Sequence, residues 1–267
     1  TYDTLRTDST LIQANIKVES REELLFDAIM LFARDLIQHY PTAQLTSWGF
    51  DTNLLEQFFK SKTLRNQLTY YGTMTRSEVR QFYTDTFLDF VRIVEAPDLA
   101  DCNIGNMTSF KLMVLVFKQQ CYRFDNLDGT IGIVMAKAGD PILKPTNIQS
   151  LFDLDCAFRK KGNVVVHGYV FNTIEAINQG RSLIVDCSLH PAPKADIDML
   201  REYVVLLPDV SPLVSEDNYR KIIADGAYYS EDLRKLCLKK GYKLIPTDMT
   251  GSPGDPFLGK FEYSEKD

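Results

Sequence analysis

The sequence lacks the cysteine spacing of a zinc site or of a disulfide-bonded domain. Its five cysteines are scattered along the chain, and no two of them follow the Cys-x-x-Cys pattern. Reduced thiols in a cytoplasmic protein are therefore expected. The sequence also has no run of about 18 apolar residues, the length that a membrane-spanning helix needs. Residues 110–117 are apolar but far too short, so no membrane partner is expected.

Cationic residues are in the minority, with 30 Lys and Arg against 36 Asp and Glu and a formal net charge of −6. This balance argues mildly against a dedicated DNA-binding domain, which usually has a basic surplus. A nuclease-type core is not excluded, because its own site is acidic and meets phosphate through metal ions. No Gly-x-Ser-x-Gly nucleophile elbow is present, so Asp186, Ser188 and His190 do not point to a hydrolase.

The remaining composition is that of an ordinary globular chain. Hydrophobic residues make up 45% and charged residues 25% of the 267 positions. Such a chain can bury a sizeable core in one large domain or two ordinary ones. It begins Thr-Tyr-Asp, without an initiator methionine or a signal-peptide pattern. We therefore expect a fragment that is trimmed at its N-terminus and at its C-terminus.

Residues 1–19 contain a predicted strand, rich in threonine, leucine and isoleucine, with Asp8 inside it. Residues 20–150 are predicted to form a helical insertion followed by a loop. Ser20 and Glu23 fit a capping box at its start, and apolar residues then recur at helical spacing. Further helices are predicted at residues 52–61, 77–96 and 109–122. Turn signals at residues 125–129 and 139–141 predict the loop.

Residues 151–267 are predicted to be rich in strands and then to alternate between helices and strands. Strands are predicted at residues 164–174, 181–188, 221–224 and 242–247, and helices at residues 196–206 and 230–240. Asp196 and Ser230 are predicted to be the N-caps of these helices. The order of elements predicts an α/β fold with a mixed, ribonuclease-H-like sheet and a large all-helical insertion.

Asp8 and Asp225 are the candidate catalytic and metal-binding residues. Asp225 ends a short apolar strand, and ligands of open α/β sheets tend to bind beyond the carboxyl ends of strands. Asp8 lies in the first strand, whose neighbours in such a sheet would bring it near Asp225. Two converging carboxylates can hold the divalent ions that assist phosphoryl transfer, and their oxygens suit Mg²⁺ or Mn²⁺. The alternative is that these aspartates only cap turns.

Several short blocks resemble those of DDE-type insertion-sequence transposases and occur in the order of that family. Residues 6–16 resemble the block around the first catalytic aspartate, and residues 20–25 are similar to the helix start that follows it in a branch with a long helical insert. Residues 153–162 (DLDCAFRKKG) resemble that branch's D-P-D-A-T-Y-R-K-K-G block, with Leu154 and Cys156 as departures.

The later blocks continue the resemblance towards the end of the chain. Residues 167–170 (HGYV) are similar to the strand that follows the basic block in that branch. Residues 224–230 (ADGAYYS) resemble the block that holds the second catalytic aspartate, and residues 247–251 (TDMTG) resemble the T-D-L-T-G that follows it. Together the blocks span nearly the whole chain.

The resemblance implies a ribonuclease-H-like fold, Mg²⁺ dependence, and cleavage and strand transfer of insertion-element DNA ends. Asp8 and Asp225 would be two of three metal-binding acids, with water and then a DNA 3′-hydroxyl as nucleophile. Transposon-end and target DNA are the implied partners, together with further copies of the chain in a homo-oligomer associated with the nucleoid. The third acid of the family is a glutamate on a later helix. Glu262 and Glu265 lie in no matching motif, so we expect that acid outside this chain.

Arg159, Lys160 and Lys161 are the candidate DNA-binding residues, because lysine and arginine supply the phosphate contacts of DNA affinity. A solvated turn before a strand is the alternative for this cluster. A competing function for the whole chain is a transposase-derived remnant that binds DNA or a protein without catalysis, which the acidic net charge and the missing third acid favour. A ribonuclease-H-like nuclease without strand joining is a further alternative.

Overall fold

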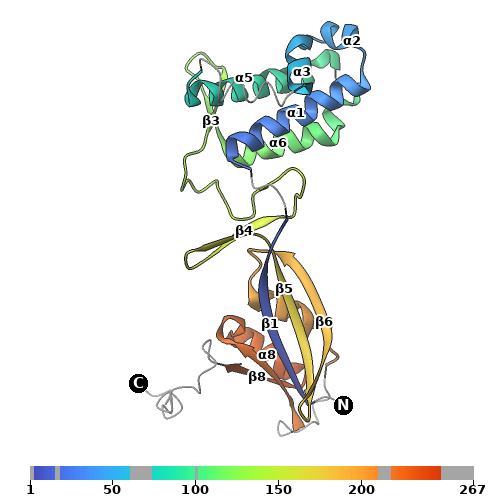
Figure 1. Cartoon of the computed structure of the whole chain (residues 1–267), viewed down its shortest axis with the longest axis vertical. Coiled ribbons are helices and arrows are strands. Elements are labelled where there is room, and N and C mark those ends of the chain that lie inside the picture. The colour runs from blue at the N-terminus through green and yellow to red at the C-terminus, as the bar shows by residue number, and fades with distance from the viewer. Residues whose placement is uncertain (1–2, 16–18, 61–73, 100–101, 210–217, 248–267) are drawn as a thin grey trace. The chain divides into compact units, whose positions relative to one another are not determined.

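The computed structural model describes residues 3–15, 19–60, 74–99, 102–209 and 218–247, apart from the side chain of Lys161. The chain divides into two compact units (Figure 1). The sheet unit contains residues Thr1–Ala14 and Phe158–Asp267, and the helical unit contains residues Asn15–Ala157. The boundaries that the sequence predicts, after residues 19 and 150, lie a few residues from these divisions.

The helical unit is built from packed helices and one short hairpin. Its helices are α1 (Arg21–His39), α2 (Thr42–Ser47), α3 (Thr52–Phe59), α5 (Arg76–Val94), η1 (Pro97–Leu99), η2 (Asn103–Asn106) and α6 (Thr108–Gln120). Its strands are β2 (Cys121–Asp125) and β3 (Ile131–Met135). The predicted loop is therefore wrong over these strands, although the predicted turn at residues 125–129 lies between them. Within the described ranges, no helix is long and apolar enough to cross a membrane.

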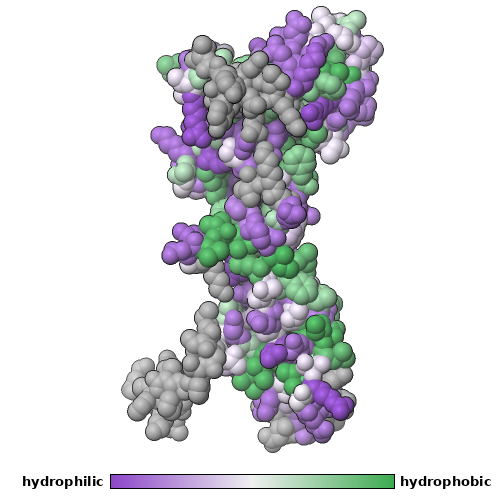
Figure 2. Space-filling view, viewed as in Figure 1, coloured by the Kyte–Doolittle hydropathy of each residue, from purple (hydrophilic) through white to green (hydrophobic). Residues whose placement is uncertain are grey.

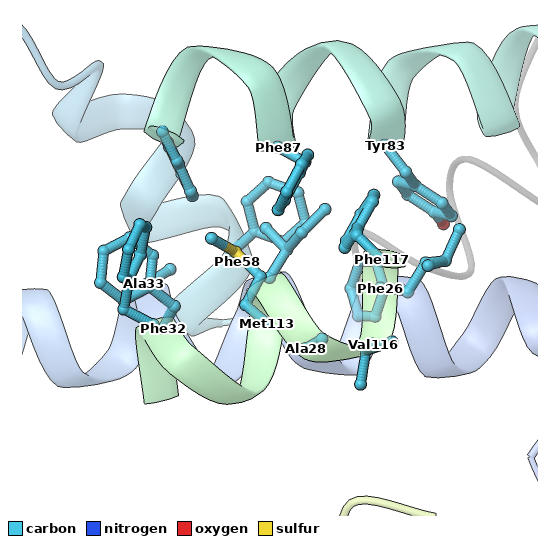
Figure 3. Packing of buried hydrophobic residues seen from close by; sticks show 14 of the residues in the cluster. Phe26, Ala28, Phe32, Ala33, Phe58, Tyr83, Phe87, Met113, Val116 and Phe117 are labelled. Atoms are coloured by element: carbon cyan, nitrogen blue, oxygen red, sulfur yellow. The ribbon is translucent and has the colours of Figure 1, made fainter. Parts of the chain in front are cut away.

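Helix α1 begins where the sequence predicts it. The Ser20 hydroxyl accepts the Glu23 amide proton at 3.3 Å, and the Glu23 carboxylate accepts the Ser20 amide proton at 2.8 Å. This reciprocal capping satisfies two backbone donors that the first turn leaves without a partner. The apolar stripe of α1 is buried against α3, α5 and α6, and its aromatic side chains interleave with theirs (Figure 3). Polar residues cover much of the visible surface of this unit (Figure 2).

The sheet unit contains a mixed six-stranded sheet with helices. Its strands are β1 (Thr4–Gln13), β4 (Ala157–Lys161), β5 (Val164–Asn178), β6 (Arg181–Pro191), β7 (Arg220–Asp225) and β8 (Tyr242–Thr247). Its helices are α7 (Asp196–Leu206), η4 (Gly226–Tyr228) and α8 (Glu231–Lys239). The predicted α/β class and mixed sheet are confirmed.

The strands β6, β5, β1, β7 and β8 lie side by side in that order, and β4 also pairs with β5. Strand β5 is antiparallel to both β6 and β1, whereas β1, β7 and β8 are parallel to one another. Parallel strands need a crossover connection, and α8 supplies it between β7 and β8. Apolar side chains of β1, β5, β7 and β8 pack with α7 and α8 in one buried cluster.

Two local features explain how the strands of this sheet fit together. Gln179 and Gly180 both have positive φ, +48° and +77°, and form the two-residue turn between β5 and β6. Gly168 allows β1 to approach β5 closely, because a Cβ atom there would lie 2.2 Å from the Ile12 carbonyl oxygen. A glycine is therefore required in the block at residues 167–170 for steric reasons.

The predicted role of Asp196 is wrong. The N-cap of α7 is Ala195, which makes no capping side-chain hydrogen bond, and Asp196 is the first helical residue. The Asp196 carboxylate accepts a hydrogen bond from the Ser9 hydroxyl at 2.8 Å instead. By contrast, Ser230 is the N-cap of α8, and its hydroxyl accepts the Leu233 amide proton at 3.2 Å, as predicted.

Candidate metal centre

Asp8 and Asp225 belong to neighbouring parallel strands of the sheet unit. The pairs Thr4–Lys221 and Arg6–Ile223 set the register between β1 and β7. The pairing ends at Arg6–Ile223, and the same register continued two residues further would bring Asp8 level with Asp225. Neighbouring strands are about 4.8 Å apart, so two carboxylates at level positions can reach a common ion.

The alternation of side chains along these strands puts both aspartates on one face of the sheet. Leu5 and Ile222 pair across the strands, and both are buried in the apolar cluster with α7 and α8. Asp8 and Asp225 are each three residues further along, and successive side chains of a strand point to opposite faces. They therefore share the face opposite the apolar cluster. Asp8 is exposed and Asp225 is half-buried, as a site open to a ligand requires.

Asp8 uses one carboxylate oxygen in a local hydrogen bond. Its Oδ1 accepts the Ser9 amide proton at 2.8 Å, and its backbone carbonyl accepts the Thr173 hydroxyl at 3.4 Å. Its Oδ2 has no hydrogen-bond partner among the residues that the structure describes. The long pairing of β1 with β5, from Thr4 to Gln13, fixes the backbone on which this carboxylate stands.

Asp225 is held in a similar way at the end of β7. Its Oδ1 accepts the Ala227 amide proton at 2.8 Å and so caps the short helix η4. Its Oδ2 likewise has no hydrogen-bond partner in the described part of the chain. Asp225 therefore does cap a turn, which is the alternative role that the sequence analysis gives for it. This role occupies only one oxygen, and the other can still bind a cation.

The donor set fits a hard divalent cation that keeps several water ligands. Mg²⁺ prefers carboxylate and water oxygens and is commonly held by one or two protein carboxylates. Asp8 and Asp225 offer two such groups from a rigid sheet. The described residues contain no group of three or more His, Cys, Asp or Glu side chains that could hold a metal ion. Glu262 and Glu265 lie outside the described residues.

A buried hydrogen-bond network connects the segments that carry the two aspartates, and the sequence alone did not indicate it. Tyr228 is fully buried, and its hydroxyl donates to the Asn172 Oδ1 at 2.9 Å. The Thr7 hydroxyl donates to the same oxygen at 3.1 Å. Burial raises the pKa of Tyr228 to about 12, so the hydroxyl remains a donor at neutral pH. The turn after Asp225 is thereby tied to the residue before Asp8.

The basic cluster is divided between the two sides of a strand. Residues 159–161 lie in β4, not in a turn, so Arg159 and Lys160 point in opposite directions. The Arg159 guanidinium lies 3.4 Å from the Asp196 carboxylate and 3.5 Å from the Lys194 carbonyl oxygen. Lys160 is exposed, and the side chain of Lys161 is outside the described atoms. Lys160 is therefore more available than Arg159 for a phosphate contact.

Comparison of the chain with protein-family models, with curated proteins and with solved structures gives no match.

Proposed function

We propose that this chain is the catalytic core of a DDE-type insertion-sequence transposase, which cleaves and joins DNA ends with Mg²⁺ or Mn²⁺. One observation carries the proposal. Asp8 and Asp225, far apart in sequence, lie on neighbouring parallel strands, each two residues beyond the paired residues Arg6 and Ile223. Each is held by one oxygen and has the other available for a cation.

The order of elements supports the same proposal. Three antiparallel strands, β1, β5 and β6, are followed by α7, β7, α8 and β8. This order agrees with the one expected of a ribonuclease-H-like sheet, and the helical unit lies between β1 and β5 in the chain, as the insertion of the resembled branch would. The sequence blocks at residues 6–16 and 224–230 coincide with the two aspartate-bearing segments.

The residues of the chain would have distinct tasks in this chemistry. A bound divalent ion would activate the attacking oxygen and stabilise the leaving oxygen of the phosphodiester. Asp8 and Asp225 would hold the ion and set its place against the sheet. Tyr228 and Asn172 would keep the two backbone segments in register, because their buried hydrogen bonds connect these segments. Lys160 would contact the DNA backbone.

A non-catalytic remnant of such a transposase is the second candidate. The net charge of −6 and the absence of a third acid near the pair among the described residues favour it. Such a protein would bind DNA or a protein partner and would need no ion at Asp8 and Asp225. Catalysis that depends on metal distinguishes the two candidates.

Removal of metal tests the proposal. The intact protein should cleave a plasmid that carries the DNA flanking its own gene when Mg²⁺ or Mn²⁺ is present. Chelation with EDTA should abolish cleavage, and added Mg²⁺ should restore it. Joining of the released 3′-hydroxyl end to a second DNA, followed on a gel, separates a transposase from a simple nuclease. Binding of the plasmid without any metal-dependent cleavage would contradict the proposal and favour the remnant.

A further inference from the structure

The helical unit contains a cationic pocket that the proposed function does not use. Its volume is about 500 Å³, and it lies between the start of α1, the first half of α5, and the segment that contains β3 and Lys137. We call it the arginine pocket after Arg21, Arg76 and Arg80. Four cationic side chains and one carboxylate line it, a formal surplus of three positive charges in a chain whose net charge is −6.

A single acidic side chain organises two of the arginines. One oxygen of Glu22 lies 3.0 Å from the Arg76 Nε atom, and the other lies 2.6 Å from the Arg80 Nε atom. Burial alone would raise the pKa of Glu22, but the hydrogen bonds and charges of the two arginines lower it overall. The carboxylate therefore stays ionised and orients both guanidinium groups, while it neutralises only one of their two charges.

The third arginine is fixed by the opposite wall. Arg21 donates one hydrogen bond from its Nη2 to the Ala136 carbonyl oxygen. Its Nε is buried and has no hydrogen-bond partner in the described part of the chain. A buried donor without a partner is unfavourable, so a bound acceptor would stabilise this arrangement. Burial lowers the pKa of Arg21, and the charge of Asp140 acts in the opposite direction; the Asp140 carboxylate itself accepts the Lys137 amide proton at 2.7 Å.

We propose that the arginine pocket binds a phosphate group. Guanidinium groups present several donors in a plane and match the oxygens of phosphate better than other side chains do. The starts of α1 and α5 both line the pocket, and helix N-termini favour anions. The phosphate belongs either to a free phosphorylated ligand or to a nucleic-acid backbone, since both offer the same group. The pocket lies wholly in the helical unit, so this inference does not depend on the metal centre.

Two double variants, each of which removes two positive charges, test the pocket. The test variant is Arg76→Gln with Arg80→Gln, and the control is Arg92→Gln with Lys118→Gln. The Arg76 and Arg92 side chains are 75% and 77% exposed, both lie on α5, and only Arg76 lines the pocket. Lys118 is an exposed residue of α6 outside the pocket. Because the test variant leaves Glu22 without its arginines, Arg76→Gln alone, which retains Arg80, serves as a milder third variant.

Binding is measured with two probes in a buffer without phosphate: inorganic pyrophosphate by calorimetry, and a short DNA duplex by fluorescence anisotropy. The wild type should bind at least one probe, and the test variant should bind it about tenfold more weakly or worse. The milder variant should lie between them, and the control should stay within about twofold of the wild type. Both measurements are made without a divalent cation, so their result is separate from that of metal-dependent cleavage, which tests the proposed function.

The two probes identify the source of the phosphate. Binding of pyrophosphate but not of the duplex indicates a free phosphorylated ligand. A nucleic-acid backbone is indicated if the duplex binds and pyrophosphate displaces it. It is also indicated if only the duplex binds and the test variant binds it about tenfold more weakly. No binding of either probe by the wild type, or equal weakening in the test and control variants, would overturn the proposal.

Discussion

Substitution of Asp225 by asparagine should reduce DNA cleavage by the intact protein about a thousandfold or more, which corresponds to about 4 kcal/mol in activation free energy. Asparagine is nearly the same size as aspartate but carries no charge. The loss of a negatively charged oxygen ligand should therefore remove the divalent ion, or displace it from the reacting phosphate. The rate is measured under saturating Mn²⁺ on plasmid DNA that carries the sequences flanking the gene.

The fold should survive this substitution. The Asp225 Oδ1 caps η4 by accepting the Ala227 amide proton, and an asparagine oxygen can accept the same proton. Asp232→Asn is the matched control, since Asp232 is an exposed carboxylate in the first turn of α8. It should leave the cleavage rate within about twofold of the wild type, because a surface charge away from the site contributes little. A wild-type rate in Asp225→Asn would show that Asp225 does not hold the catalytic ion.

Substitution of Phe32 by alanine should destabilise the helical unit by about 3–5 kcal/mol. Phe32 is fully buried on α1. The centroid of its ring lies 5.6 Å from the ring centroid of Phe90 and 5.2 Å from that of Phe110. Its ring fills the space among α1, α5 and α6 (Figure 3). Alanine would leave a cavity there, and the surrounding helices can close it only in part.

The single tryptophan of the chain makes this measurement selective. Trp48 packs against the core of the helical unit, so its fluorescence during urea unfolding reports on that unit alone. Phe59→Ala is the control, because Phe59 is 39% exposed at the end of α3. It should lower the free energy of unfolding by less than about 1 kcal/mol. Similar losses in the two variants would contradict the packing of Phe32 described above.

Much of the local structure could be predicted because its causes are local. Capping by Ser20 and Ser230, the stripe of apolar residues on α1, and the turn at Gln179 and Gly180 each depend on a few neighbouring residues. The extent of β8 agrees with the prediction residue for residue. The hairpin of β2 and β3 was missed, because its strands are short and largely exposed and so show little alternation of apolar and polar residues.

The candidate site depends on contacts between residues that are distant in sequence. Strand position and the resemblance indicate Asp8 and Asp225, but only the structure shows that their strands β1 and β7 are parallel neighbours, paired up to Arg6 and Ile223. The network of Thr7, Asn172 and Tyr228 joins β1, β5 and η4, which are distant in sequence, so no local pattern could indicate it.

For other residues, the role in the structure differs from the role that the sequence predicts, or the sequence predicts no role. Asp196 was predicted to cap a helix, yet its carboxylate lies near Ser9 and Arg159, which no spacing rule connects to it. The arginine pocket also gave no sequence signal. Arg21 and Arg80 are far apart in the chain, and each is ordinary in its own helix.

The central claim is that Asp8 and Asp225 hold one divalent ion, and Mn²⁺ binding measured by electron paramagnetic resonance tests it most directly. The wild type and Asp232→Asn should bind Mn²⁺ with the same affinity. Asp8→Asn and Asp225→Asn should each weaken that affinity about tenfold or more, and the double variant should lose little beyond either single one, because ligands of a shared ion act as a unit. Undiminished Mn²⁺ binding in both single variants would contradict the claim.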